Sequence, residues 1–330
     1  MQSASSKQAT LAVLENPLSG RNSRQPGALK QICKSADIPW HSASTPEALQ
    51  KYVRELLVNP PDILAVSGGD GTISAVLNVF EGHPDPASLP ALALLCGGST
   101  NMIQRELGLS GNPTRALQNV LNDTRAGITP GRIQQRSPFG VLSDDGQPEQ
   151  FGFFFAAGAM SRILQFCQEA FSRKAINGVF IESLALLSVF SRLFILKKAT
   201  GDIFHHDDIR WARHTNGQKK PSDWHGGPSI FIYLTSLNRL LLGFNPRGRH
   251  NALKLVTYKH PFTRRGLLTY LLSRGGSDRK KTQEVEHDSS DKYSLCFKGQ
   301  WVLDGEFYGH PDKDSKLKIR TCQPLPFFIM

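Results

Sequence analysis

The sequence has few cysteines and no apolar run long enough for a confident membrane span. Its five cysteines are scattered, with no Cys-x-x-Cys pair, and stand at Cys33, Cys96, Cys167, Cys296 and Cys322. This spacing indicates neither a zinc site nor a disulfide framework, and it favours buried thiols in a reducing compartment. The longest apolar region, residues 175–195, is interrupted by Asn177, Glu182 and Arg192, so we expect no transmembrane helix.

We also expect no signal peptide, because the first seven residues contain no apolar core. Its net charge is +11 over 330 residues. Such an excess of lysine and arginine suits nucleic acid, ATP or an anionic membrane surface. The sequence shows no helix-turn-helix, zinc finger or RNA-binding aromatic signature, so we expect no nucleic-acid partner. We expect a cytoplasmic protein that is peripheral at the membrane.

The first 130 residues alternate between strand and helix patterns. Strand patterns cover residues 10–14, 63–66 and 91–95, and helical patterns cover residues 27–36, 46–57, 73–80 and 114–121. This alternation predicts a parallel sheet that is covered on both faces and binds its ligand beyond the carboxyl ends of the strands.

From about residue 128 the pattern changes to short strand-like runs separated by polar turns, which predicts an antiparallel second domain. Helical patterns interrupt these runs at residues 161–173 and 180–198. A stretch at residues 275–291, first glycine-rich and then charged, predicts a mobile loop.

The most informative segment follows the strand pattern at residues 63–66. It reads Ser67-Gly68-Gly69-Asp70-Gly71-Thr72 and leads into a helical pattern. A strand, a glycine turn and a helix start form the geometry that cradles phosphate, because glycines let main-chain N–H groups approach the oxygens. An aspartate in such a loop repels phosphate, so we expect the Asp70 carboxylate to have a specific function. It could take part in a magnesium-linked water network or organise a nucleophile.

This segment resembles the nucleotide-binding signature of the diacylglycerol kinase catalytic-domain superfamily, which includes sphingosine, ceramide and bacterial lipid kinases. Related loops occur in NAD kinases and phosphofructokinases, so this motif alone leaves the phosphate acceptor open. Three further segments resemble the family in the same order along the chain: Asn16-Pro17-Leu18-Ser19-Gly20, Gly97-Gly98-Ser99-Thr100-Asn101 and Asp304-Gly305-Glu306.

The resemblance implies an α/β nucleotide-binding domain followed by a β-sandwich domain. We therefore expect an α/β ATP-binding kinase domain at residues 1–130. A β-sandwich lipid-acceptor domain with a helical insertion is expected at residues 131–315. The tail at residues 316–330 is expected to return to the first domain.

The resemblance also implies nucleotide contacts from four places in the first domain. The first loop contributes Asn16, Ser19 and Gly20, and the second holds the phosphates with Gly68, Gly69, Asp70, Gly71 and Thr72. In the third loop either Ser99 or Thr100 supplies a hydroxyl beside Asn101. Ser42 or Thr45 supplies another, although Thr45 is equally well placed to cap a helix that begins at Pro46.

The late Asp304-Gly305-Glu306 segment suits proton transfer. A lipid hydroxyl has a pKa far above 7, so a positioned carboxylate must accept its proton during phosphoryl transfer. By resemblance, Asp304, Glu306 and Asp70 are catalytic, and one of Asp304 and Glu306 is the general base. The sequence leaves open which one, and an ordinary Asp-Gly hairpin turn is the alternative interpretation.

Metal and membrane contacts are less clearly marked. Many bacterial relatives have an acidic stretch associated with a structural magnesium, but residues 245–255 here carry bases instead. We therefore expect Mg²⁺ to enter with ATP. The run at residues 205–208, His-His-Asp-Asp, predicts a solvated loop rather than a metal site. The apolar helix at residues 180–194 is flanked by cations, which suits either a membrane-facing lid or a core helix.

Together these features predict an ATP-dependent lipid kinase that converts diacylglycerol to phosphatidic acid. A kinase for a soluble acceptor such as NAD, and a nucleotide- or lipid-binding relative without turnover, are the alternatives. The sequence leaves the oligomeric state open, a homodimer included.

Overall fold

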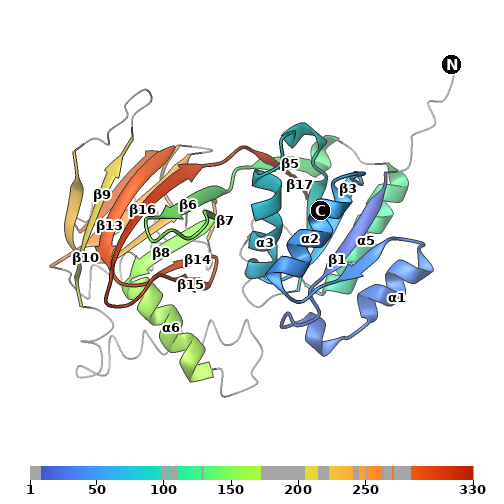
Figure 1. Ribbon diagram of the computed structural model, residues 1–330, viewed down its shortest axis with the longest axis horizontal. Helices are drawn as coiled ribbons and strands as arrows, with labels where there is room; N and C mark the ends of the chain where they lie inside the picture. The colour runs from blue at the N-terminus through green and yellow to red at the C-terminus, as the bar shows by residue number, and fades with distance from the viewer. Residues whose placement is uncertain are drawn as a thin grey trace. The chain divides into compact units, whose positions relative to one another are not determined.

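A computed structural model describes residues 9–97, 103–104, 107, 111–127, 130–171, 205–214, 223–240, 245–249, 252–261, 263, 270 and 284–329 (Figure 1). The chain divides into two compact units. The first comprises Met1–Ser137 and Gln323–Met330, and the second comprises Pro138–Cys322.

The first unit is built on a six-stranded sheet with the order β2-β1-β3-β4-β17-β5. Its strands are β1 (Leu11–Glu15), β2 (Trp40–Ser42), β3 (Ile63–Gly68), β4 (Ala91–Cys96), β5 (Ile133–Arg136) and β17 (Leu325–Phe328). All neighbours are parallel except β17 and β5. Its α-helices are α1 (Ala28–Ser35), α2 (Pro46–Leu56), α3 (Asp70–Glu81) and α5 (Pro113–Ala126).

The central strands of this sheet are buried along their whole length, because helices cover both faces. Every residue of β3 and β4 is buried. One core cluster joins the strands to α1 and α5. In Figure 1, α2 and α3 lie on the other side of β1 and β3, and these two helices pack against each other. The α/β class predicted for this half of the chain is thus confirmed.

Two details of the first unit differ from the expected pattern. Helix α3 begins at Asp70 rather than at residue 73, because Gly69 is its N-cap and the Asp70 carboxylate stands in the first turn, where negative charge is favourable. Strand β17 comes from the end of the chain and lies between β4 and β5. The predicted tail began at residue 316, whereas the return to this unit begins at Gln323.

The second unit is an antiparallel β domain with an 11-stranded sheet. Its strands are β6 (Phe139–Ser143), β7 (Gln150–Gly152), β8 (Phe154–Gly158), β9 (Asp207–Arg213), β10 (His225–Thr235), β11 (Leu253–Lys259), β12 (Val285–Ser290), β13 (Lys292–Lys298), β14 (Trp301–Leu303), β15 (Glu306–Tyr308) and β16 (Asp314–Thr321), and helix α6 spans Ala159–Phe171. One core receives alternate residues from most of these strands, so the sheet wraps around it. An antiparallel, β-rich second half was predicted correctly.

The predicted mobile loop at residues 275–291 is wrong in its described part. Residues 285–290 form β12, which pairs with β11 along its whole length. The sequence of β12, Val-Glu-His-Asp-Ser-Ser, contains one apolar residue, so it has no alternating signal. Strand β12 has a single neighbour in the sheet, and such an edge position tolerates polar residues.

Among the described helices, none is long and apolar enough to cross a bilayer. The apolar stretch at residues 175–195 and the predicted helix at residues 180–198 lie outside the described residues.

Candidate functional site

Three loops meet at the carboxyl edge of the first sheet. They follow β1, β3 and β4, which are adjacent parallel strands, so the loops are neighbours in space. In an open parallel sheet this edge is where ligands bind. Residues 16–20, residues 67–72 and Gly97 lie here, and residues 98–101 of the third segment lie outside the described residues.

Asn16 links the first loop to the second. Its main-chain N–H donates to the Ser67 carbonyl at 2.8 Å, and its side-chain Nδ2 donates to Thr72 Oγ1 at 3.0 Å. Ser19 folds back on the same loop, because its Oγ donates to the Asn16 carbonyl at 2.9 Å. Asn16 and Ser19 therefore shape the loop, and Thr72 is bound to it.

Asn22 and Ser67 complete this arrangement, and sequence reasoning missed both. Asn22 Nδ2 donates to the carbonyl oxygens of Asn16 at 2.8 Å and Ser67 at 3.1 Å, while Ser67 Oγ donates to Asn22 Oδ1 at 2.9 Å. Both side chains are buried. Their only sequence signal is proximity to the glycines, because a buried asparagine inside a polar loop has no pattern of its own.

Close main-chain approach explains two of the glycines. A Cβ on Gly68 would lie 2.4 Å from Cβ and Oγ1 of Thr72, and a Cβ on Gly97 would lie 2.7 Å from the Gly68 main-chain nitrogen. The second and third loops are thus packed main chain against main chain. Only glycine permits this.

Helix α3 points its amino end at this edge of the sheet. Gly69 is the N-cap, Asp70 and Gly71 open the first turn, and the Thr72 N–H donates to the Gly69 carbonyl at 3.0 Å. The amino end of a helix favours anions. Asp70 is 7% exposed, so its carboxylate is held inside the loop cluster rather than in solvent.

The remaining predicted nucleotide contacts have different settings. Gly20 is exposed in the first loop, and Ser42 is exposed at the end of β2. Thr45 Oγ1 accepts from the Ala48 N–H at 3.3 Å, so it caps α2. Ser99, Thr100 and Asn101 lie outside the described residues.

In the second unit, Asp304 is anchored by main-chain amides. The Phe154 N–H donates to Asp304 Oδ1 at 2.8 Å, and the Phe153 N–H donates to Oδ2 at 3.0 Å. Asp304 is 4% exposed, and a Cβ on Gly152 would lie 2.5 Å from its Oδ2. Its carboxylate is therefore built into the link between β7 and β8.

Glu306 has a different environment from Asp304. Asp304 and Gly305 have φ values of 48° and 93°, and Leu303 pairs with Glu306, so the segment is a two-residue hairpin turn. The Asp-Gly hairpin turn is therefore present, and the catalytic roles of Asp304 and Glu306 stay predictions. Glu306 opens β15 with an exposed side chain. Burial and the nearby carboxylates of Glu306 and Asp304 raise the pKa of Tyr308 to about 12.

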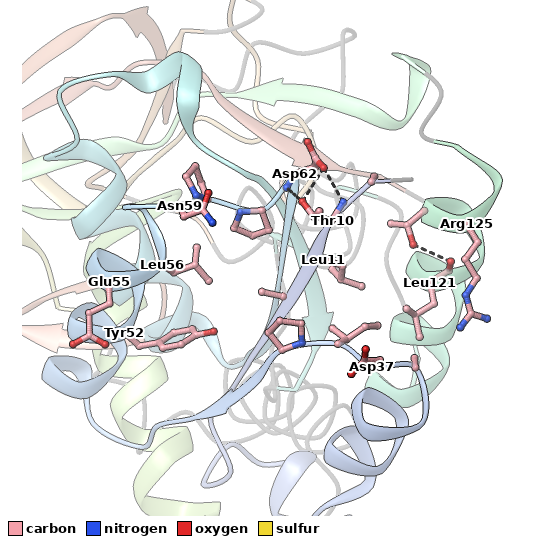
Figure 2. Close-up of a pocket in the computed structure, with 18 residues that line it drawn as sticks. Thr10, Leu11, Asp37, Tyr52, Glu55, Leu56, Asn59, Asp62, Leu121 and Arg125 are labelled. Atoms are coloured by element: carbon pink, nitrogen blue, oxygen red, sulfur yellow. Dashed lines mark hydrogen bonds between the residues drawn. The ribbon is translucent and has the colours of Figure 1, made fainter. Parts of the chain in front are cut away.

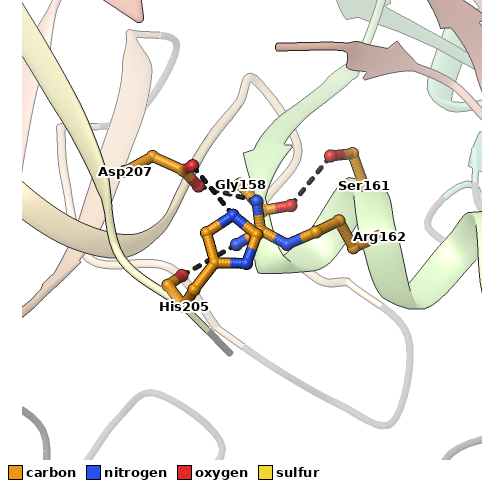
Figure 3. A network of polar contacts seen from close by, with 5 residues as sticks. All are labelled: Gly158, Ser161, Arg162, His205 and Asp207. Carbon is orange, nitrogen blue, oxygen red and sulfur yellow. Dashed lines mark hydrogen bonds and ion pairs between the residues drawn. The ribbon is translucent and has the colours of Figure 1, made fainter. Parts of the chain in front are cut away.

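The segment at residues 205–208 is only in part the solvated loop that was expected, because His205 and His206 are exposed outside a strand, whereas the second half of the run belongs to one. Asp207 begins β9, and its carboxylate pairs with Arg162 at 2.8 Å and with His205 at 3.3 Å (Figure 3). The Arg162 Nη2 also donates to the His205 carbonyl at 2.9 Å, as Figure 3 shows. These pairs fasten the start of β9 to the first turn of α6. Within the described ranges, no cluster of metal-ligating side chains occurs.

A pocket of 790 Å³ lies in the first unit at the opposite edge of the sheet (Figure 2). It is lined by the starts of β1 and β3 and by the last turns of α2 and α5. At its rim Asp62 Oδ2 accepts from the N–H and the hydroxyl of Thr10, at 2.7 and 2.8 Å. The pocket is therefore separate from the three loops.

Comparison with known proteins agrees with this geometry. Residues 10–133 match the family model of the diacylglycerol kinase catalytic domain. Over these residues the chain thus matches that family, as the sequence resemblance predicted. No curated protein matches the chain.

Solved structures share the fold over almost the whole chain. A diacylglycerol kinase from Bacillus anthracis str. Sterne matches with a TM-score of 0.62 and 14% identity, covering 98% of this chain and 97% of that one. A candidate diacylglycerol kinase from the same strain matches with a TM-score of 0.66 and 16% identity over the same shares. At these identities the likeness establishes the fold alone.

Proposed function

We propose that this chain is an ATP-dependent lipid kinase. It transfers the γ-phosphate of ATP to the free hydroxyl of diacylglycerol or a related lipid, and phosphatidic acid is the product expected from diacylglycerol. The observation that carries the proposal is the cluster of hydrogen bonds by which Asn16, Asn22 and Ser67 join the loops after β1 and β3, while the Gly97 carbonyl after β4 accepts from the Arg21 N–H at 2.9 Å. This cluster lies within the residues that match the diacylglycerol kinase catalytic domain.

In this proposal the loop cluster binds the phosphates. Main-chain amides at Gly68–Thr72 and the amino end of α3 supply donors and partial positive charge. The first loop, with Asn16, Ser19 and Gly20, and the third loop, with Ser99, Thr100 and Asn101, contact the rest of the nucleotide. Of the two hydroxyls proposed after the second strand, Ser42 is the better candidate, since Thr45 already caps α2.

Mg²⁺ fits this site as a companion of ATP. Asp70 offers carboxylate oxygens at the amino end of α3, and such oxygens are the ligands that Mg²⁺ prefers. When bound, Mg²⁺ neutralises charge on the transferred phosphoryl group.

Glu306 is the better candidate for the general base. Its carboxylate is exposed, whereas that of Asp304 accepts hydrogen bonds from two buried amides. As the lipid oxygen bonds to the γ-phosphorus and the bond to the β-phosphate oxygen breaks, the hydroxyl proton moves to Glu306 and ADP leaves. Asp304 holds the turn that carries Glu306.

The test incubates the purified chain with labelled ATP, Mg²⁺ and mixed anionic liposomes that contain candidate lipids. We expect label in phosphatidic acid, and none with Asp70→Asn or Glu306→Gln. Asp145→Asn is the control, because Asp145 is an exposed turn residue. Nucleotide binding without labelled lipid would contradict the proposal, and label in NAD would identify a soluble acceptor.

The same liposomes test the predicted membrane partner. Sedimentation with anionic but not neutral vesicles would support a peripheral protein, as the net charge of +11 leads us to expect. A cytoplasmic location and a homodimer remain predictions.

A further inference from the structure

A buried hydroxyl group lies one peptide group away from the Asp304 carboxylate. It belongs to Thr235, the last residue of β10, which is fully buried. Thr235 Oγ1 donates to the Phe153 carbonyl at 2.8 Å. That carbonyl belongs to the peptide group whose N–H, on Phe154, donates to Asp304 Oδ1 at 2.8 Å. The hydroxyl and the carboxylate thus polarise one peptide group from its two ends.

The same hydroxyl is fixed from the other side. Thr235 Oγ1 accepts from the Leu237 N–H at 3.0 Å, so its proton has to point towards Phe153. The Ser236 N–H adds a second hydrogen bond to the Phe153 carbonyl at 3.3 Å. The sheet register sets Thr235 opposite Phe154 on β8 and opposite Lys254 on β11.

Lys254 holds the turn that follows Thr235. Its side chain is 2% exposed, and its Nζ donates to the Leu237 carbonyl at 3.0 Å and to Asn238 Oδ1 at 2.8 Å. A lysine is seldom buried so fully, because desolvation of an ammonium group is costly unless its donors are bonded. A continuous set of buried hydrogen bonds therefore runs from Lys254 through Thr235 to Asp304.

We infer that Thr235 is a positioning residue for the Asp304–Gly305 turn and, through it, for the Glu306 carboxylate. The turn has only two residues, and among the described strands the three-residue β15 pairs with β14 alone. The anchor on Asp304 is therefore a main determinant of the direction of Glu306. The part of the inference that concerns Glu306 rests on the proposed function, whereas the part that concerns the turn does not.

The experiment compares three variants of the full chain. Thr235→Val removes the hydroxyl and keeps the shape, and Thr235→Ser keeps the hydroxyl. Thr257→Val is the matched control, because Thr257 is also fully buried but its Oγ1 has no hydrogen-bond partner in the described structure. Each variant is measured for kcat, for KM of ATP, for its unfolding midpoint in urea, and for amide hydrogen exchange at Phe153 and Phe154.

For Thr235→Val we expect exchange at Phe153 and Phe154 to be about tenfold faster and kcat to fall about tenfold, with KM for ATP unchanged. Thr235→Ser should retain both values, and Thr257→Val should change neither. The inference is overturned if Thr235→Val loses only stability, if Thr257→Val lowers kcat equally, or if Thr235→Ser is as impaired as Thr235→Val. If the unaltered chain phosphorylates no lipid, the proposed function fails, and the exchange rates alone decide whether Thr235 positions the turn.

Discussion

The two units fix their candidate functional groups in opposite ways. In the first unit, a side chain holds the main chain, because Asn22 binds the carbonyl groups of Asn16 and Ser67 and is itself bound by the Ser67 hydroxyl. In the second unit, the main chain holds a side chain, because two amides bind Asp304. The first arrangement presents fixed main-chain donors, which suit a phosphate. The second leaves the neighbouring carboxylate of Glu306 exposed, which suits a group that must gain and lose a proton.

This difference determines how each site should respond to substitution. Loops packed main chain against main chain have no room for an added methyl group at Gly68 or Gly97. An exposed carboxylate can be replaced without steric cost, so its loss should appear in the rate and hardly in the stability. Three substitutions test this contrast.

The largest effect is expected from Glu306→Gln. Loss of a general base typically costs about 10²- to 10⁴-fold in rate, and we expect kcat to fall by this order while the unfolding free energy changes by less than about 0.5 kcal/mol. Steady-state kinetics and urea unfolding measure the two quantities. Asp304→Asn should instead affect stability more than kcat. We expect a loss of about 1–3 kcal/mol in unfolding free energy, because an amide nitrogen cannot accept from a main-chain N–H. A Glu306→Gln enzyme with unchanged kcat would remove Glu306 from the chemistry.

A smaller effect on a different quantity is expected from Gly68→Ala. The new methyl group would overlap Thr72, and overpacking of this kind costs about 1–3 kcal/mol. We also expect a weaker affinity for ATP, because Thr72 and the first turn of α3 must move. Urea unfolding and calorimetric titration with ATP measure both effects. The control is Gly131→Ala, where a Cβ would meet no atom within 4 Å. Equal losses in the two variants would contradict a specific role of close packing at Gly68.

The smallest expected effect is a pH dependence of stability that differs between the two units. Burial, and then the charge of Arg247, lower the pKa of His287 on β12. The unfolded chain therefore binds a proton at His287 more readily than the folded chain does. The folded chain holds His287 neutral, so protonation of His287 favours the unfolded chain. The fold is free of this penalty above the ordinary histidine pKa of about 6.5, and it loses stability as pH falls towards the lower folded-state pKa.

We therefore expect the second unit to lose hydrogen-exchange protection when pH is lowered from about 7.5 to 5.5, after correction for the intrinsic exchange rate. His287→Gln should remove part of that dependence. His214, whose pKa is also lowered by burial, lies in the same unit and should retain the rest. An identical pH response of the two units would be evidence against this assignment.

The sequence predicted those parts of the molecule whose geometry restricts the amino acid. Strands β3 and β4 are buried on both faces, so residues 63–66 and 91–96 form continuous apolar runs. The Asp304–Gly305 turn needs positive φ at both positions, so it carries the Asp-Gly pair typical of such hairpins. Where geometry allows many residues, as on the polar edge strand β12, no pattern marked the structure.

The roles of buried polar side chains also could not be predicted from the sequence. Asn22, Ser67 and Thr235 act through hydrogen bonds to groups far away along the chain, and such partners depend on the finished fold. The division of roles between Asp304 and Glu306 was left open for the same reason. It depends on where the amides of Phe153 and Phe154 lie.

Strand β17 has a consequence for how the chain folds. Phe327 and Phe328 are fully buried, and β17 separates β4 from β5 in the sheet of the first unit. A ribosome releases β1 to β4 long before it releases β17, so the sheet of the first unit cannot be completed until the whole second unit has been synthesised. The two units are therefore tied together in their maturation, and loss of residues 325–328 would damage the half of the protein that was made first.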